Sequence, residues 1–456
     1  MTVFVDQNEI RARFSRAMSQ MYRQEVPLYG DLVDLVETTN AEVMEADPAL
    51  KARLEATDGL ERISEERHGA IRVGTAEELH TMRRLFAVMG MTPVGYYDLS
   101  VAGIPVHSTA FRPTDGEALK RSPFRVFTSL LRSELIADAG LRAEAEAILA
   151  GRDIFSPEAR RLIARHEADG GLGEADTELF IAEALKTFRW HSDARVSEAT
   201  YQRLHDSHRL VADVVSFHGP HINHLTPRTL DIDQVQADMP KRGISPKAVI
   251  EGPPPRRCPV LLRQTSFRAL QEAIAFVGQE SGTGKHTARF GEIEQRGVAL
   301  TAEGRALYDR LLDDARGLAQ PKADGSNAAD YMAALAEVFA PLPDDYGQLR
   351  EAGLAFFHYS ATGKPLDAGA DTATEALVQS GHLRFDPIVY EDFLPVSAAG
   401  IFQSNLGDNA AAERLDGSNR DAFEAALGTS VADEFALYQA LQAASLTASR
   451  AALGLH

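Results

Sequence analysis

The chain has 456 residues, of which 44% are hydrophobic, and its formal net charge at pH 7 is −19. This length and apolar content predict a globular protein, and the negative charge argues against nucleic acid and anionic membranes as partners, because both attract clustered Lys and Arg. The one cysteine, Cys258, excludes an internal disulfide and a multi-thiolate metal site. The N-terminus has charges where a signal peptide places its apolar core, and no uncharged run approaches the ~20 residues of a membrane span, so we expect a cytoplasmic protein.

Periodic apolar positions predict helices at both ends of the chain and a β-rich core between them. Residues 1–60 are predicted to form an N-terminal helical segment, with apolar positions three and four apart. Alternating runs indicate a core of the α+β class over 61–300. It is interrupted at 114–210 by Ala-, Glu- and Arg-rich sequence that we interpret as a helical insertion. Residues 301–456 are predicted to form a mainly helical C-terminal segment that closes the site.

Two stretches of the core share the same spacing of residues and the same predicted order of elements. The first runs from His68 to Phe111 and the second from His224 to Phe267, so that the histidine and the phenylalanine are 43 positions apart in both (111 − 68 and 267 − 224). In each stretch a strand-like run leads to a helix and then to paired strands. In the first, Thr75 can cap the helix. The repeat predicts a duplicated βαβββ-like core in which equivalent positions face each other across a pseudo-twofold axis.

Such a duplication brings one histidine per copy to a shared site, which is a natural way to build a metal centre. Two His and one carboxylate form the facial triad of non-haem iron oxygenases, which leaves positions open for substrate and oxygen. His68 and His224 would supply two ligands. The last strand of the second copy offers Glu292 and Glu294, which point to one face because side chains alternate with period two. Periodicity therefore leaves the third ligand open, and both acids could instead be ordinary solvated side chains.

Arg72 follows His68 by four residues, which places both side chains on the same side of a strand or a helix. We interpret it as a residue that could hold a carboxylate beside the metal, although a surface ion pair is the alternative. His218 and His221 superficially suggest a zinc site with His224. A proline between them disfavours a helix, and in an extended strand His221 would face away from the other two, whereas His218 could support the metal ligands from outside.

Three pieces of the chain resemble the 2-oxoadipate dioxygenase/decarboxylase family, whose members are also called 2-hydroxyglutarate synthases. The pieces are His68-Gly-Ala-Ile-Arg72, Asn223-His-Leu-Thr-Pro-Arg228 and Phe290-Gly-Glu-Ile-Glu-Gln-Arg-Gly297, and the resemblance covers nearly the whole chain. It implies a core similar to the vicinal oxygen chelate fold and to hydroxymandelate synthase. It also implies Fe(II) bound by His68, His224 and Glu292, with Glu294 as the alternative third ligand.

The resemblance implies a reaction as well. 2-Oxoadipate, a 2-oxo diacid, and O2 would become 2-hydroxyglutarate and CO2, as a step of lysine catabolism. No separate 2-oxoglutarate would be needed, because the substrate supplies its own oxo acid. Arg72 would hold the distal carboxylate, and Val396 and Ser397 resemble the family's substrate-contacting pair.

Two other functions stay open on the residues alone. The His, His and Glu set could hold zinc in a hydrolase, with Glu292 or Glu294 as the general base. The chain could instead be a non-catalytic scaffold whose helical segments carry partner surfaces. No pattern in the chain assigns an oligomeric state.

Overall fold

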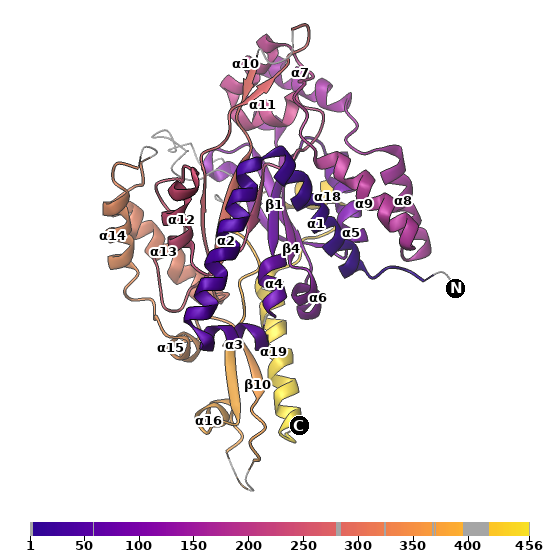
Figure 1. The fold of residues 1–456 in the computed structure, drawn as a ribbon. Helices are drawn as coiled ribbons and strands as arrows, with labels where there is room; N and C mark the ends of the chain where they lie inside the picture. The colour runs from indigo at the N-terminus through magenta and orange to yellow at the C-terminus, as the bar shows by residue number, and fades with distance from the viewer. Residues whose placement is uncertain are drawn as a thin grey trace. The chain divides into compact units, whose positions relative to one another are not determined.

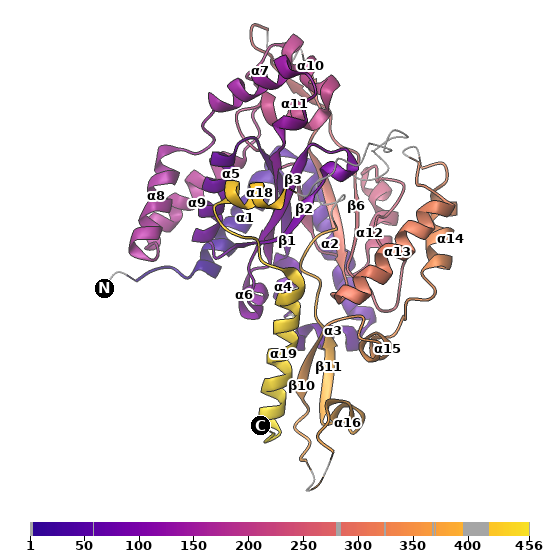
Figure 2. The same cartoon turned by 180° about the vertical axis from the view of Figure 1, so that it is seen from behind.

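The computed structural model describes residues 3–57, 59–279, 284–322, 325–366, 369, 371–394 and 419–455 (Figures 1 and 2). The chain divides into two units. The first unit comprises Met1–Lys247, Thr265–Glu294 and Phe393–Ala432, and the second comprises Ala248–Gln264, Gln295–Asp392 and Asp433–His456.

One seven-stranded sheet has the order β2-β3-β4-β1-β5-β9-β6. The central strands β1 and β5 are antiparallel, β4 is parallel to β1, and β9 is parallel to β5. Each half therefore repeats the same pairing on its own side of the β1–β5 pair, which confirms the predicted α+β class and duplicated core. The strands are β1 (Arg67–Val73), β2 (Thr92–Asp98), β3 (Val106–Arg112), β4 (Phe124–Leu131), β5 (His224–Pro227), β6 (Leu262–Ser266) and β9 (Phe290–Arg296).

Polar side chains cap the N-termini of several helices in the first unit. The side chain of Thr75 caps α5, as predicted, and Asp6 caps α1. Helices α1 and α2 contact β4 and β5 and cover one face of the sheet in Figure 1. A small hairpin pairs β7 (Glu272–Ile274) with β8 (Gly284–His286). The helices are α1 (Gln7–Glu25), α2 (Pro27–Ala46), α3 (Pro48–Thr57), α4 (Leu60–Glu65), α5 (Ala76–Val88), α6 (Gly116–Arg121), α7 (Ala139–Ala150), α8 (Pro157–Asp169), α9 (Glu174–Phe188), α10 (Glu198–Ser207), α11 (Arg209–Ser216), α12 (Ile232–Asp238) and α18 (Arg420–Leu427).

The range 114–210 is not the wholly helical insertion that its composition predicts. Phe124–Leu131 forms β4, which lies between β3 and β1 in the sheet, and all eight of its residues are buried. A strand buried on both faces lacks the alternation by which strands are recognised. The remainder of the range is mainly helical, from α7 to α10.

The second unit contains a β-hairpin beside a long C-terminal helix. Strands β10 (Phe357–Ala361) and β11 (Leu383–Pro387) pair antiparallel, and β10 packs along α19 (Glu434–Ala452) in both views. The other helices of this unit are α13 (Ala302–Leu318), α14 (Ala328–Val338), α15 (Tyr346–Glu351) and α16 (Thr374–Gln379). None of the helices described in either unit is long and apolar enough to cross a membrane.

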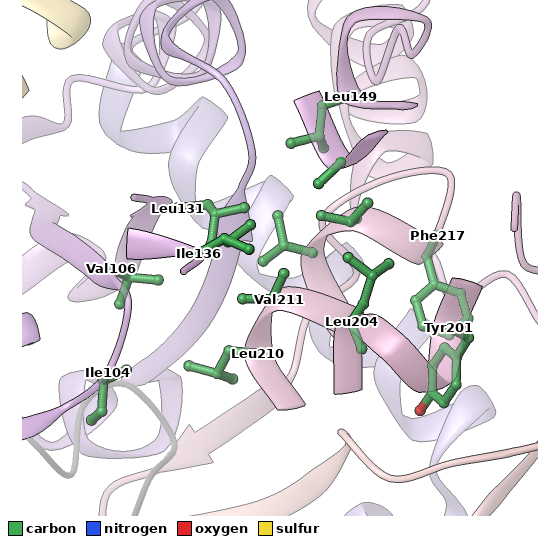
Figure 3. Packing of buried hydrophobic residues seen from close by; sticks show 14 of the residues in the cluster. Ile104, Val106, Leu131, Ile136, Leu149, Tyr201, Leu204, Leu210, Val211 and Phe217 are labelled. Atoms are coloured by element: carbon green, nitrogen blue, oxygen red, sulfur yellow. The ribbon is translucent and has the colours of Figure 1, made fainter. Parts of the chain in front are cut away.

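A cluster of buried apolar side chains packs α7, α10 and α11 of the first unit against β3 and β4 (Figure 3). Leu204, Leu210 and Val211 lie among its members, and burying a side chain of this size is worth about 1.5–3 kcal/mol. Every residue of α11 from Leu210 to Ser216 is buried, including one acid, Asp213. The cluster therefore holds a carboxylate in a defined place inside the protein.

Glu66, which is fully buried, is the centre of an ion cluster at the start of β1. Its carboxylate lies 2.9 Å from Nη2 of Arg125 and 2.9 Å from Nη1 of Arg228. Nε of Arg62 is 3.5 Å away. Arg125 belongs to β4 and Arg228 directly follows β5, so that one carboxylate links the three neighbouring strands at the middle of the sheet.

We expect Glu66→Gln to lower the free energy of unfolding by about 3–5 kcal/mol, because it removes the negative charge of a buried carboxylate that pairs with several buried guanidinium groups. Denaturant unfolding followed by circular dichroism measures the change. Glu61→Gln, at an exposed acid of α4, is the matched control and should alter stability by less than about 0.5 kcal/mol. Equal stabilities of the two variants would contradict the role of the cluster.

Candidate metal centre

Three neighbouring strands bring His68, His224 and Glu292 together. In the antiparallel β1–β5 pair, His68 is opposite Thr226 and Ala70 is opposite His224. Residues that are directly opposite share a face of the sheet, so both histidines project from the same face. Strand β9 adds Glu292 two residues after the partner of His224. One ligand atom from each of the three lies within 4.8 Å of the others, and all three side chains are fully buried.

The two glutamates of β9 contact opposite nitrogens of the His68 ring. Nε2 of His68 lies 3.1 Å from Oε1 of Glu292, whereas Nδ1 lies 2.9 Å from Oε2 of Glu294. The same Oε1 of Glu292 is 3.8 Å from Nε2 of His224 and accepts a hydrogen bond from the hydroxyl of Thr226 at 3.1 Å. Glu292 is therefore grouped with both histidines. Glu294 lies behind the His68 ring, where a carboxylate can fix the orientation of a metal-ligating histidine.

Burial and neighbouring charges separate the pKa values of these groups. Burial, together with the charges of His68 and Arg72, holds the pKa of His224 well below its usual range. Burial raises the pKa of Glu292, and His68 opposes this shift without cancelling it. Burial by itself would lower the pKa of His68, but the carboxylates of Glu294 and Glu292 outweigh it and raise the pKa. His224 is thus a neutral imidazole, the form that binds metals.

The imidazole of His224 is the feature that best fits a metal. Its Nδ1 and Nε2 are both buried, and neither has a hydrogen-bond partner among the described residues. A buried polar atom without a partner costs roughly 1–3 kcal/mol and normally indicates a bound water or ion. A divalent metal between His68, His224 and Glu292 would satisfy the nitrogen that faces the carboxylate. Two imidazoles and one carboxylate suit iron or zinc and leave coordination positions open.

Aromatic rings surround the two histidines. Phe393 meets the His68 ring edge to face at 5.0 Å between centroids, and Phe127 meets Phe393 at 5.4 Å. Phe290 lies beside His224 at 4.9 Å. Such apolar walls keep water from the site and strengthen the electrostatic interactions inside it.

Arg72 lies on the same face of β1 as His68, and its guanidinium is paired with a buried acid. Its Nη1 is 2.7 Å from Oδ2 of Asp213, which comes from α11, and both side chains are buried. The charge of Arg72 is also one cause of the low pKa of His224, which puts the guanidinium within electrostatic reach of the candidate centre.

A second cluster of buried ligand-type side chains, which the sequence patterns missed, adjoins Arg72. It consists of Asp213, His221 and His286. His221, which strand alternation predicts to face away from His224, belongs to this cluster. Asp213 and His286 carry no signal in the sequence, because α11 and β8 meet only in the folded chain.

Two further predictions concern His218 and the pair Val396 and Ser397. His218 is half-exposed and pairs with Asp193 at 2.8 Å, so the expectation that it supports the metal ligands is wrong. Val396 and Ser397 lie outside the described residues, and their contact with a substrate stays a prediction.

Known proteins resemble this chain over almost its full length. The family model for 2-oxoadipate dioxygenase/decarboxylase matches residues 14–405. A protein of that name from Pseudomonas putida is 60% identical over 456 residues, covering 99% of this chain and 98% of that one. Another, from Escherichia coli, is 55% identical over 438 residues, covering 95% and 96%. The crystal structure of the hydroxyglutarate synthase from Pseudomonas putida in complex with 2-oxoadipate matches with a TM-score of 0.92 at 58% identity, covering 99% of each chain.

We expect Glu292→Ala to abolish binding of a divalent metal, whereas Glu294→Gln should keep the metal and weaken its affinity by roughly 10–100-fold. The reason is that only Glu292 shares a ligand cluster with both histidines. Metal content after dialysis and chelator competition measure both effects, with a thermal melt to confirm folding. If Glu294→Gln lost the metal as completely as Glu292→Ala, the grouping would be wrong.

The metal affinity of the metal-free protein should rise with pH from about pH 6 to pH 8, because the carboxylates raise the pKa of His68 and a metal must displace its proton. Chelator competition at a series of pH values measures the slope. Glu294→Gln should flatten the curve, since it removes one of the carboxylates that favour the proton. An affinity that is constant or falls over this range would count against the assignment of His68.

Proposed function

The chain belongs to the 2-oxoadipate dioxygenase/decarboxylase family, and we propose that it converts 2-oxoadipate and O2 to 2-hydroxyglutarate and CO2 with Fe(II) held by His68, His224 and Glu292. The main support for a bound metal is the buried, neutral imidazole of His224, whose ring nitrogens have no hydrogen-bond partner among the described residues. The 58% identity with a hydroxyglutarate synthase solved in complex with 2-oxoadipate supports the substrate.

Iron is the metal that the reaction class favours. Zinc fits the same three donors but has no redox chemistry, whereas a two-His, one-carboxylate set with open positions is typical of Fe(II) oxygenases. A ferrous ion at this site would supply electrons for the activation of O2 and a Lewis acid for the 2-oxo acid group.

The proposed reaction balances without a second reductant. The bond between the first carboxyl carbon and the keto carbon breaks, CO2 leaves, and one atom of O2 completes a new carboxylate at the former keto carbon. The other oxygen atom enters a C–H bond of the neighbouring carbon and becomes the hydroxyl group. The two oxidations together provide the four electrons that reduce O2.

The protein's own residues bind and orient the reactants in this proposal. Arg72 would hold the distal carboxylate of the substrate through its guanidinium, which has five N–H donors and can serve two carboxylates. Phe393 keeps an apolar wall against His68, and Glu294 holds the ring of His68 from behind. Val396 and Ser397 are proposed to contact the substrate on the strength of the family resemblance alone.

The other partners that we propose follow from composition and family. With a net charge of −19 and one cysteine, the chain suits a reducing compartment and small-molecule partners. We therefore propose a cytoplasmic enzyme, and its place in lysine catabolism stays an inference from the family.

Protein loaded anaerobically with Fe(II) should consume O2, release CO2 and form 2-hydroxyglutarate in equimolar amounts when 2-oxoadipate is added. An oxygen electrode and product chromatography measure this across 2-oxo diacids of different length. His68→Ala and His224→Ala should remove the activity while leaving the protein folded. A zinc hydrolase would take up no O2 with either metal, and that result would refute the proposal.

Arg72→Gln should raise the KM for 2-oxoadipate by roughly 100-fold, because it removes the charge that we assign to the distal carboxylate. Arg72→Lys keeps a charge but loses the planar fork, so a rise of about tenfold is expected. The control substrate is 2-oxohexanoate, which has the same carbon chain without the distal carboxylate. An Arg72→Gln variant that discriminates between the two substrates as the wild type does would rule out this role.

A further inference from the structure

The ion pair of Arg72 with Asp213 is part of a larger buried network. Oδ2 of Asp213 contacts Arg72 at 2.7 Å, while its other oxygen, Oδ1, lies 3.0 Å from Nε2 of His286 and 3.3 Å from Nε2 of His221. The opposite nitrogen of His286, Nδ1, is 2.8 Å from the hydroxyl of Tyr201. Both carboxylate oxygens are thus engaged, and each histidine approaches from a different segment of the chain.

The carboxylate of Asp213 is held in one place by packing as well as by these contacts. Its helix α11 is buried along most of its length, and its neighbours Val211 and Val214 belong to the apolar cluster shown in Figure 3. Burial alone would raise the pKa of Asp213, but the two histidines and the guanidinium hold it well below its usual range. The group facing Arg72 is therefore a fixed negative charge.

We propose that Asp213, held by His221 and His286, is a positioning residue that aims the guanidinium of Arg72 at the distal carboxylate of the substrate. This inference rests on the proposed function, in which Arg72 binds that carboxylate. A long, flexible arginine side chain loses rotamer entropy when a bound substrate fixes it in one conformation. An ion pair already formed through Nη1 removes much of that cost before the substrate arrives. Asp213 thereby contributes to the preference for a diacid over a monoacid without touching either.

The same three side chains could in principle hold a second cation, since their ligand atoms also lie within 4.8 Å of one another. The surrounding charges favour the hydrogen-bonded network instead. Arg72 occupies the second oxygen of the carboxylate, and burial, with smaller contributions from the charges of His286 and Arg289, lowers the pKa of His221. The guanidinium of Arg289 also stacks on Trp190, whose ring meets that of His221. The guanidinium of Arg289 is itself paired with Glu25 and Glu272, so the repulsion of a divalent ion comes mainly from Arg72, which already contacts Asp213.

Steady-state kinetics of the Fe(II)-loaded full chain with 2-oxoadipate and 2-oxohexanoate test the proposal. Asp213→Asn should raise the KM for 2-oxoadipate about tenfold with little change in kcat, and should leave kcat/KM for 2-oxohexanoate unaltered. Combined with Arg72→Gln it should add nothing further, because both changes act through one guanidinium. Asp98→Asn neutralises a largely but not fully buried acid that pairs with Arg132 elsewhere in the first unit, and it is the matched control, expected to behave as the wild type.

Tyr201→Phe keeps the aromatic ring and removes only the hydroxyl that contacts His286. It should raise the KM for 2-oxoadipate by roughly two- to threefold in the same substrate-selective way, and it covers the case in which Asp213→Asn does not fold. An equal loss for both substrates, or additive effects in the double variant, would overturn the positioning role. Loss of a second equivalent of metal from Asp213→Asn would do so too and would assign the cluster as a cation site.

The outcomes also separate this inference from the proposed function. Absence of O2 uptake by the wild type with any 2-oxo diacid overturns both. If Arg72→Gln removes the preference for the diacid and Asp213→Asn leaves it intact, only the positioning role fails.

Discussion

The antiparallel pairing of β1 with β5 at the middle of the sheet is the constraint on which the candidate centre depends. A slip of one residue in this register would turn His68 and Arg72 to the opposite face, because side chains alternate along a strand. The ion cluster around Glu66 links β1 to both of its neighbours. A side chain at Gly69 would place its Cβ 2.5 Å from Cδ1 of Ile222, so glycine permits the close approach of the chain that leads into β5. The strand register, the ion cluster and the space left by Gly69 therefore all favour the same pairing of β1 with β5.

The same sheet face concentrates charges that would be costly if each were buried alone. His68 lies between two carboxylates, those of Glu292 and Glu294, and Arg72 is matched by Asp213. His224 is the exception, since it is buried in its neutral form and without a hydrogen-bond partner among the described residues. Removing one member of a buried charged set costs several kcal/mol. The arrangement therefore favours a cation bound between His68, His224 and Glu292, with the guanidinium of Arg72 held in a fixed position beside it.

Much of the fold could be predicted from the periodicity of apolar residues and from the repeat. The prediction failed for segments and residues that have no periodic pattern. The cap at Thr75 and the duplicated core follow from local patterns and are confirmed. Strand β4 could not be recognised within the range 114–210, because a strand that is buried on both faces lacks the alternating polar positions by which strands are identified. Asp213 and His286 could not be found at all, since nothing in their own neighbourhoods distinguishes them from other acids and histidines.

The sequence by itself determined which strands carry the ligand-type residues, and it placed His68 with Arg72, and Glu292 with Glu294, on shared faces. It could not choose between the two glutamates, because residues two apart on a strand point the same way. Only the tertiary structure distinguishes their positions, because it groups Glu292 with both histidines and places Glu294 behind the His68 ring. The physical reason is that alternation fixes the face from which a side chain projects, whereas the distance to a partner on another strand depends on register and twist.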